Sequence, residues 1–470
     1  MNLGDPPGAS SALFERQKAA AAREPAPDAA SRRAALATLE SLLRGNADAL
    51  AKAISADFGG RSLHETQLLE IFPAIEGIRH ARRHVGAWMR PQRRATNFWF
   101  LPGRSHVMFQ PLGVVGIVVP WNYPVYLAVG PMVAAMAAGN RMLVKMSEAA
   151  TATGELFASL VARHFPPECV AVVNGGPDVA KAFCALPFDH LLFTGSTAVG
   201  RQVMRAAAEN LTPVTLELGG KSPALVGRDF PVAEAAERIL FGKCLNAGQT
   251  CIAPDYALVP EESVAAFIEG ARRAVAKLYP RLAESPDYTS IVNDRQRERL
   301  DAVLAEATRG GATVVDLTPA FGTIASRKLA PRIVTGARDD SRLMQEEIFG
   351  PLLPVVPYKV LDDAIAYVNA RPRPLALYVF DHDRRHVERV LGETVSGGVS
   401  VNETLMHIAQ EDLPFGGVGQ SGMGRYHGRD GFETFSVKKA VFHQSRVNGL
   451  KLFRPPYGAR FEALVKFLSR

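Results

Sequence analysis

The sequence predicts an α/β protein with two parallel-sheet units and a small β arm. Short apolar runs alternate with stretches of helical periodicity, which is typical of parallel strands covered by helices on both faces. This alternation begins again after the glycine pair at 219–220, so we expect the join between the two units there. At 470 residues the chain is also too long for one simple core.

The first unit contains a long stretch, residues 111–140, that carries no charged side chain. A membrane span is one interpretation of such a stretch. Pro120, Pro124 and Pro131 favour a buried strand, a loop and a buried helix instead. The strands expected in this unit are 114–119, 142–145, 170–174, 191–193 and 214–218. The second unit is expected to hold strands 224–226 and 257–259 and helices 232–245 and 264–278.

The region before the first strand is expected to be partly helical. Residues up to about 27 are rich in alanine and proline and are expected to be extended. Two helices should follow, one with leucines at helical spacing before Gly45 and one that carries Leu50 and Ile54 and stops at Gly59. Residues 97–110 predict two strands joined at Pro102-Gly103. Since an isolated hairpin needs a partner sheet, we expect an arm that packs on another subunit or domain, and it fits an oligomerisation arm.

Composition and charge exclude several classes of protein. The net charge is +7, and the densest basic run, between Arg79 and Arg94, has no nucleic-acid motif beside it, so a solvated helix face and loop is the favoured interpretation. The four cysteines form no CxxC pair, and no histidine cluster has metal-ligand spacing. We therefore expect no disulfide framework, no metal site and a reducing, cytoplasmic compartment; the first residues also lack the pattern of a signal peptide.

Two residues carry the strongest chemical hypothesis. Cys251 follows the end of an expected helix, with Gly248 beside it, which suits a partly exposed nucleophilic thiolate. Any single cysteine is more often a buried structural residue. Glu217 ends an apolar strand before a glycine pair, at the sheet edge where open α/β folds place ligands. Burial there would raise its pKa and suit a general base, whereas the alternative is a surface glutamate on an edge strand.

Other polar residues follow the strands of the first unit. Asn122 could donate its amide to an oxyanion, or it is an ordinary turn residue. Gly195 to Gly200 follows a strand and opens a helix, which favours a phosphate, although this spacing is weak as a dinucleotide fingerprint. Lys145 and Glu148 follow another strand and suit a ribose or phosphate, but each alone could be surface charge.

Taken together, these residues resemble the aldehyde dehydrogenase superfamily over roughly residues 30 to 445. Cys251 follows Glu217 by 34 residues, as in that family. The matching motifs are Pro-Trp-Asn-Tyr-Pro at 120–124, Phe-Thr-Gly-Ser-Thr at 193–197, Glu-Leu-Gly-Gly-Lys-Ser-Pro at 217–223, Gly-Gln-Thr-Cys at 248–251, Glu-Glu-Ile-Phe-Gly-Pro at 346–351 and Pro-Phe-Gly-Gly at 414–417. Each motif is common, but the combination is specific.

The resemblance implies a role for each matching residue. Cys251 would be the nucleophile, Glu217 the base for the deacylating water, and the Asn122 amide with the Cys251 backbone N–H the oxyanion hole. The cofactor would be held by eight residues, namely Trp121, Lys145, Glu148, Gly195, Ser196, Gly200, Glu347 and Phe349. NAD is expected because Glu148 should repel a 2′-phosphate, with NADP possible, since Met146 stands where the family usually has proline.

The resemblance also implies a domain arrangement. The implied arrangement is the aldehyde dehydrogenase fold, with two Rossmann-like parallel-sheet domains. Residues 1–96 and 111–218 would form the cofactor-binding domain and 219–410 the catalytic domain. Residues 97–110 and 430–470 would form oligomerisation and bridging segments.

A finer resemblance is to the shorter, class 3-like members of the superfamily. The segments 401–417 and 451–458 look like those of bacterial coniferyl aldehyde dehydrogenases, which implies an aromatic aldehyde as substrate. Class 3-like members favour a homodimer. The amphipathic C-terminal segment with Phe461, Leu464, Val465 and Leu468 is too short to cross a membrane and should pack on the same or a partner subunit, with surface lipid as the alternative.

Three alternatives stay open from the sequence. The substrate could be a medium- or long-chain aliphatic aldehyde. The acyl group could pass to CoA or phosphate instead of water, although Glu217 favours hydrolysis. A binding or structural protein could keep this fold without turnover, but the presence of Cys251, Glu217 and Asn122 together argues against that class.

Overall fold

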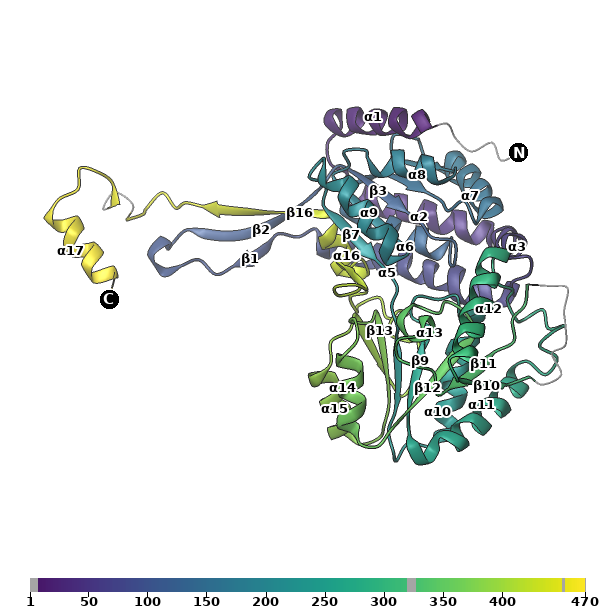
Figure 1. Cartoon of the computed structure of the whole chain (residues 1–470). Coiled ribbons are helices and arrows are strands. Elements are labelled where there is room, and N and C mark those ends of the chain that lie inside the picture. The colour runs from purple at the N-terminus through teal and green to yellow at the C-terminus, as the bar shows by residue number, and fades with distance from the viewer. Residues whose placement is uncertain (1–6, 319–326, 450–452, 470) are drawn as a thin grey trace.

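The computed structural model describes residues 7–318, 327–449 and 453–469. Two parallel-type sheets lie one above the other in the body of the molecule, and a thin β arm projects from one side (Figure 1). The chain passes from the first sheet to the second between Glu217 and Pro223, on either side of the glycine pair that the sequence singled out. The α/β fold class is confirmed.

The first sheet has six strands in the order β15-β7-β6-β3-β4-β5. All neighbours are parallel except β15, which pairs antiparallel with β7 at the edge. The strands are β3 (Val114–Val118), β4 (Arg141–Lys145), β5 (Val170–Val173), β6 (His190–Thr194), β7 (Val214–Glu217) and β15 (Gly422–Met423). The five strands expected in this unit are confirmed, and their nearly continuous burial explains why they appear as unbroken apolar runs.

Helices cover both faces of this sheet. One face packs against α1 (Pro7–Arg23), α8 (Pro177–Cys184) and α9 (Thr197–Ala208). The other packs against α2 (Ala29–Gly45), α6 (Tyr126–Ala138) and α7 (Thr151–His164). Outside these lie α3 (Ala47–Phe58), α4 (Leu63–Thr66), which continues into a π-helical turn at Gln67–Ile71, and α5 (Phe72–Trp88).

The uncharged stretch at 111–140 forms β3, a loop and α6, as predicted. Twelve of the thirteen residues of α6 are buried, because the helix lies inside the body between α5 and the sheet. Within the described ranges, no helix is long and apolar enough to cross a membrane. The absence of charge therefore reflects burial in protein.

The second sheet has seven strands in the order β10-β11-β12-β9-β8-β13-β14, and only β10 is antiparallel to its neighbour. The strands are β8 (Pro223–Val226), β9 (Tyr256–Pro260), β10 (Thr313–Asp316), β11 (Arg332–Thr335), β12 (Leu352–Tyr358), β13 (Ala376–Phe380) and β14 (Gly398–Val401). Its helices are α10 (Val232–Cys244), α11 (Val264–Leu278), α12 (Asp294–Arg309), α13 (Arg342–Gln345), α14 (Leu361–Asn369) and α15 (Arg384–Glu393). The strands and helices expected here are confirmed.

The arm differs from the predicted hairpin. Residues 97–110 do not form two strands: Phe98–Phe100 is a turn of 3-10 helix, and β2 (Arg104–Pro111) begins after it. The partners of β2 are β1 (Gln92–Arg94) and β16 (Ser436–His443), both antiparallel. Pro102-Gly103 precedes β2, so the turn lies where expected, but the strand before it ends at Arg94.

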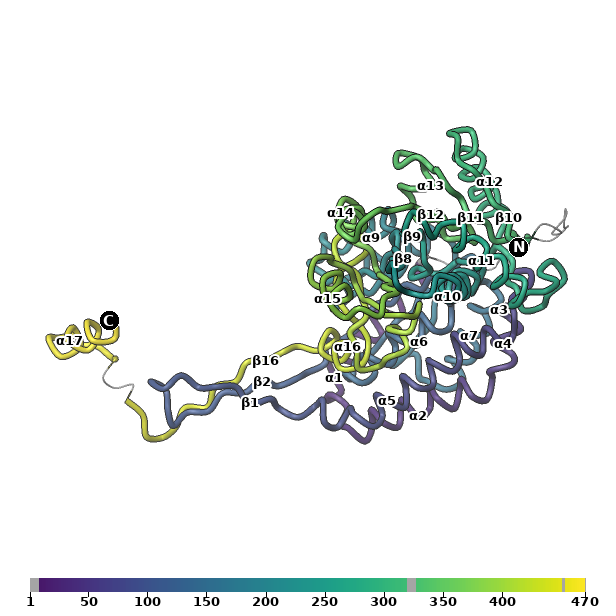
Figure 2. Tube along the Cα trace, turned by 90° about the horizontal axis from the view of Figure 1, so that it is seen from below, coloured from purple at the N-terminus to yellow at the C-terminus, as the bar shows by residue number. Residues whose placement is uncertain are grey.

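Both ends of the chain are helical, and the N-terminal one differs from expectation. The N-terminal segment, expected to be extended, is the helix α1, in which Phe14 is buried against the first sheet and Gln17 donates to the carbonyls of Met142 and Pro167. The C-terminal amphipathic segment is the helix α17 (Ala459–Leu468), which has no buried residue. It lies beyond the arm and away from the body in both views (Figures 1 and 2). Between them, α16 (Gly428–Thr434) packs on α5 and α6.

Candidate active site

Four polar or glycine positions lie at one edge of the first sheet. Because β3, β4, β6 and β7 are parallel, their carboxyl ends meet at the same edge. Lys145, Gly195 and Glu217 stand at or just after these ends, and Asn122 follows in the loop after β3. The structure therefore brings together residues that the sequence separates by about a hundred positions.

Glu217 is a buried carboxyl group at the end of β7, with 3% of its surface exposed. Neither carboxylate oxygen has a hydrogen-bond partner among the described residues. Burial raises the pKa of Glu217 well above its usual range, and Arg425 opposes that shift. A Cβ at Gly416 would lie 2.2 Å from the Gly424 carbonyl oxygen and 2.8 Å from the Glu217 Oε1, so the backbone and the carboxylate together require glycine at that position. Such a group is suited to accept a proton near neutral pH.

Cys251 follows a strained turn between α10 and the second sheet. Asn246 and Ala247 have φ of 50° and 51°, a region that residues other than glycine rarely adopt. Cys251 itself is partly exposed. Burial of the sulfur raises the pKa of Cys251, and so do the carboxylates of Glu347 and Glu217, while the N–H groups of Cys251 and Ile252 lower it. The structure thus brings Cys251 within electrostatic reach of Glu217.

Asn122 lies in the loop after β3 with 4% of its surface exposed. Its side-chain Nδ2 donates to the Gln249 carbonyl oxygen at 3.2 Å, two residues before Cys251. An amide nitrogen carries two hydrogens, so one donor remains for a substrate oxygen. This hydrogen bond ties the Asn122 loop directly to the turn that presents Cys251.

A buried ionic network connects the segment with Arg61 and Glu70 to the loop after β3. The sequence did not predict this network. Arg61 Nη1 donates to Glu70 Oε1 at 2.8 Å and to the Asn122 backbone carbonyl at 3.1 Å. Glu70 Oε2 accepts from the N–H groups of Val125 and Tyr126, at 2.8 and 3.1 Å. No local pattern marks Arg61 or Glu70, since charged residues beside a helix are usually solvated.

The strained turn at Asn246 and Ala247 is held by hydrogen bonds to Glu65 and to the loop with Asn122. Glu65 Oε1 accepts from the backbone N–H of Asn246 at 2.7 Å. The Asn246 Nδ2 donates to the backbone carbonyls of Asn122 and Gln249, and the Gln249 Nε2 donates back to the Asn246 carbonyl at 2.9 Å. These bonds over-determine the turn and so maintain its unusual backbone.

The residues expected to bind a dinucleotide lie along the same sheet edge. Lys145 Nζ donates to the carbonyls of Met146 and Gly175, both at 2.7 Å, and burial lowers its pKa. Glu148 is exposed in the loop after Lys145. Ser196 is the N-cap of α9, and its hydroxyl accepts from Val199 N–H. Backbone donors at this helix start are the kind of group that binds a phosphate.

Glu347 reaches the same edge from the second unit. A Cβ at Gly219 would lie 1.9 Å from its Oε2, so the carboxylate rests directly on that glycine. Burial and the neighbouring Asp255 raise the pKa of Glu347 to about 8, and its Oε1 has no partner among the described residues. Phe349 has a φ of 51°, and its ring lies edge-on to Trp121 with centroids 5.3 Å apart. Gly200, the last of the residues expected to bind the cofactor, packs closely on Leu218, because a Cβ at Gly200 would lie 2.7 Å from that side chain.

Comparison with known proteins identifies this arrangement. The model of the aldehyde dehydrogenase family matches residues 8–441. The chain belongs to the aldehyde dehydrogenase family. A probable coniferyl aldehyde dehydrogenase of Pseudomonas aeruginosa is 55% identical over 97% of this chain and 95% of its own length. The coniferyl aldehyde dehydrogenase of a Pseudomonas species is 48% identical over 91% and 89%.

Solved structures agree with this assignment. The substrate-bound state of Staphylococcus aureus AldH aligns over 100% of both chains with a TM-score of 0.91 and 36% identity. The aldehyde dehydrogenase of Mycobacterium tuberculosis complexed with NAD+ aligns over 93% of this chain and 90% of its own, with a TM-score of 0.84 and 28% identity. This aldehyde dehydrogenase is an oxidoreductase that acts on aldehydes and uses NAD(P), as the sequence predicted.

The described residues contain no cluster of histidine, cysteine, aspartate or glutamate suited to a metal ion. In the motif at 451–458, Lys451 and Leu452 lie outside the described residues.

Proposed function

We propose that the chain oxidises an aldehyde to its carboxylic acid through a thioester on Cys251, with Glu217 as the base. The observation that supports this most directly is the placement of a buried, unpartnered carboxyl group within electrostatic reach of a partly exposed cysteine. The Cys251 thiolate attacks the carbonyl carbon, and the oxygen takes up the negative charge. The Asn122 Nδ2 and the Cys251 backbone N–H stabilise that oxyanion by donating hydrogen bonds.

The residues present fit a nicotinamide dinucleotide. Lys145 and Glu148 would hold the adenosine ribose, Gly195 and Ser196 the pyrophosphate, and Glu347 the nicotinamide ribose, with Gly219 leaving room for that carboxylate. Trp121, Phe349 and Gly200 line the same site. The chemistry that a bound nicotinamide supplies is acceptance of the hydride that the thiohemiacetal releases.

Deacylation then restores the enzyme. Glu217 takes a proton from a water molecule, the water oxygen attacks the thioester carbon, and the Cys251 sulfur leaves as the acid forms. The raised pKa of Glu217 suits this step, because a stronger base accepts the water proton more readily.

Two variants test these roles. Cys251→Ala should abolish NADH formation while leaving NAD+ binding intact by titration calorimetry. Glu217→Gln should release one NADH per subunit in a burst and then stall at the acyl-enzyme. Substantial turnover by the first variant, or an unchanged steady state in the second, would remove that residue from its role. Stimulation of turnover by CoA or phosphate would favour acyl transfer to those acceptors over hydrolysis.

We infer further that the substrate is an aromatic aldehyde such as coniferyl aldehyde. The support is the identity of 55% and 48% to two proteins that carry that substrate in their names. A panel of coniferyl aldehyde, benzaldehyde, hexanal and decanal, each with NAD+ and NADP+, tests the inference by kcat/KM. A higher kcat/KM for the aliphatic aldehydes would overturn it.

The arm supports a homodimer. It projects from the body (Figure 2). It also carries four large apolar residues, Phe98, Trp99, Phe100 and Leu101, each at least 44% exposed. Such a group of exposed apolar residues marks an interaction site. Sedimentation of the full chain should give twice the 50.7 kDa chain mass, and replacing the four side chains by serine should give the monomer.

A further inference from the structure

A buried ion pair joins the segments that carry Glu217 and Cys251. Lys221 lies between β7 and β8, a few residues after Glu217, and Asp255 lies directly before β9, a few residues after Cys251. Lys221 Nζ pairs with Asp255 Oδ2, and the two side chains are only 9% and 4% exposed. The Lys221–Asp255 pair therefore links the strand end with the general base to the segment with the nucleophile.

The ammonium of Lys221 also binds the main chain around α13. Its Nζ donates to the carbonyl oxygens of Leu343 at 2.8 Å and Glu346 at 3.0 Å. An ammonium carries three hydrogens, so these two carbonyls and Asp255 satisfy it completely. Leu343 lies in α13 and Glu346 directly after it, so Lys221 holds the start of the loop that contains Glu347.

The pair holds the main chain on both sides of Glu347. The Glu346 carbonyl oxygen, which accepts from Lys221, belongs to the peptide group before Glu347. The N–H of Ile348, in the peptide group after it, donates to Asp255 Oδ1 at 3.0 Å. Because peptide groups are planar, holding the two that flank a residue fixes its φ and ψ. The pair thus determines the direction in which the Glu347 side chain leaves the backbone.

Arg299 of α12 binds the same loop. Its Nη2 donates to the Ile348 carbonyl oxygen at 2.5 Å, and its Nη1 donates to that of Glu347 at 3.5 Å. The next residue, Phe349, has the left-handed backbone that surrounding contacts must maintain. The loop is therefore held by side chains from outside it, and its own backbone preference does not decide its shape.

The Glu347 carboxylate points back to the segment that carries Lys221. The ideal Cβ position at Gly219 lies 1.9 Å from the Glu347 Oε2, and Gly219 stands just before Lys221 in the chain. The other oxygen, Oε1, is buried without a partner among the described residues. A buried acceptor without a partner is costly unless a ligand donates to it, and a ribose hydroxyl is such a donor.

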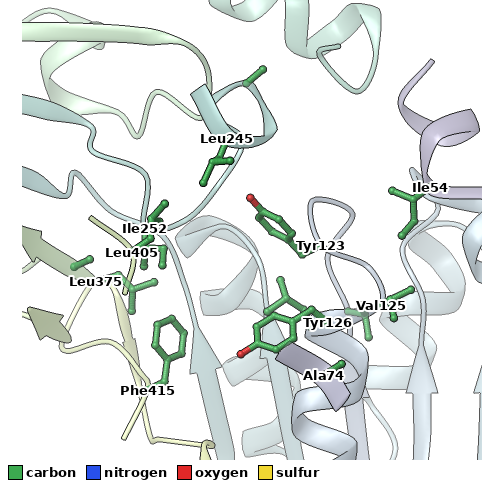
Figure 3. Packing of buried hydrophobic residues seen from close by; sticks show 14 of the residues in the cluster. Ile54, Ala74, Tyr123, Val125, Tyr126, Leu245, Ile252, Leu375, Leu405 and Phe415 are labelled. Carbon is green, nitrogen blue, oxygen red and sulfur yellow. The ribbon is translucent and has the colours of Figure 1, made fainter. Parts of the chain in front are cut away.

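The Cys251 segment is held at both of its ends. Ile252, directly after Cys251, belongs to the buried apolar cluster that Figure 3 shows in part. At the other end, the Asp255 N–H donates to the Ser222 carbonyl oxygen at 2.7 Å. Apolar packing and the ion pair together fix how this segment lies relative to the Glu347 loop.

We propose that Lys221 is a positioning residue for the nicotinamide half of the cofactor. Through Asp255 and the Glu346 carbonyl it holds the Glu347 carboxylate where the nicotinamide ribose binds, so the proposal rests on the proposed placement of that ribose at Glu347. A buried ion pair contributes little net stability, because the loss of water around two charges offsets their attraction. The geometry that the pair imposes on the loop gives it a use that stability does not.

The test compares two ligands, of which only one reaches Glu347. Titration calorimetry gives the Kd of NAD+ and that of ADP, which has the adenosine half but no nicotinamide ribose. In Lys221→Met we expect the ratio of the NAD+ Kd to the ADP Kd to rise about tenfold or more, because the loop must then be ordered when the nicotinamide half binds. The ADP Kd itself should stay within about twofold of the wild type.

Two further variants separate positioning from general damage. Lys221→Arg keeps the cation and should restore part of the ratio. Lys277→Met is the matched control, because the Lys277–Glu237 pair is 2.6 Å long but its side chains are 70% and 46% exposed. It should leave both Kd values unchanged.

A ratio in Lys221→Met within about twofold of the wild type, or an equal loss of both ligands, would overturn the proposal. If that variant does not fold, Asp255→Asn is judged by the same criterion, since it keeps the side-chain shape and removes the charge. In Glu347→Ala an unchanged ratio would remove Glu347 from the ribose site and Lys221 from its role. A raised ratio there, with an unchanged one in Lys221→Met, would refute the role of Lys221 alone. Binding requires no turnover, so failure of the proposed chemistry at Cys251 leaves this test intact.

Discussion

Removing the Arg61 guanidinium should destabilise the protein by about 3–5 kcal/mol, the usual cost of breaking a buried ion pair. Neither side chain of the Arg61–Glu70 pair has exposed surface, and their charged atoms are 2.8 Å apart. Arg61 also lies 3.7 Å from Glu65 and 4.7 Å from the centre of the Tyr123 ring. Arg61→Met keeps most of the side-chain volume and leaves both carboxylates without their cation.

The loss of unfolding free energy in Arg61→Met should grow as the pH rises. Burial raises the pKa of Glu65 to about 7 and raises that of Glu70, and Arg61 opposes both shifts. In Arg61→Met both pKa values rise further in the folded state. A folded pKa above the unfolded value means that stability is lost as pH rises through the folded pKa, so the deficit should be larger at pH 8 than at pH 6.

The assay is urea unfolding followed by circular dichroism at both pH values. Arg44→Met is the matched control, because the Arg44–Glu40 pair is 3.7 Å long and Arg44 is 60% exposed; about 0.2–1 kcal/mol is expected there. The double variant Arg61→Met/Glu70→Gln should be more stable than the sum of the single losses predicts. A deficit below about 1 kcal/mol for Arg61→Met, or strict additivity, would refute the reasoning.

Three further predictions concern the site. Because burial and two carboxylates raise the pKa of Cys251, its alkylation by iodoacetamide in the absence of cofactor should keep accelerating up to pH 9; a plateau below pH 8 would contradict this. Gly219→Ala should weaken NAD+ binding about tenfold or more by displacing the Glu347 carboxylate, whereas Gly392→Ala, with open space around it, should bind as the wild type does. Glu148→Gln should raise kcat/KM with NADP+ relative to NAD+ several-fold, and an unchanged ratio would count against repulsion of the 2′-phosphate.

The strands of both sheets were predictable because parallel strands are buried on two faces and appear as short apolar runs. The segment expected to be extended, α1, shows the limit of such reasoning. Its alanine and proline content favoured an extended chain, but Phe14 and Gln17 hold the helix to the first sheet through residues more than a hundred positions away. The prediction of a hairpin in the arm was wrong for the same reason, because β2 pairs with β16 near the other end of the chain.

The sequence predicted the site residues that stand in recognisable motifs. It did not predict the buried residues that hold them in place. Glu217 is the last residue of β7 and Asn122 lies in the loop after β3, so the position of a strand end predicts where they lie. Arg61 and Glu70 lie in a loop and a helix, and their burial depends on the loop that follows β3. Tertiary contact decides whether such a charge is solvated or enclosed, and a single sequence does not record it.

The short strand β15 has a consequence for biosynthesis. It covers the outer edge of β7, the strand that ends in Glu217, although about two hundred residues of chain separate the two. A ribosome delivers the N-terminal part first, so the other five strands of this sheet have an open edge at β7 until β15 emerges. Competence for turnover then arises only when translation is nearly finished, and a truncated product that ends before residue 422 should remain inactive and prone to aggregate through that edge.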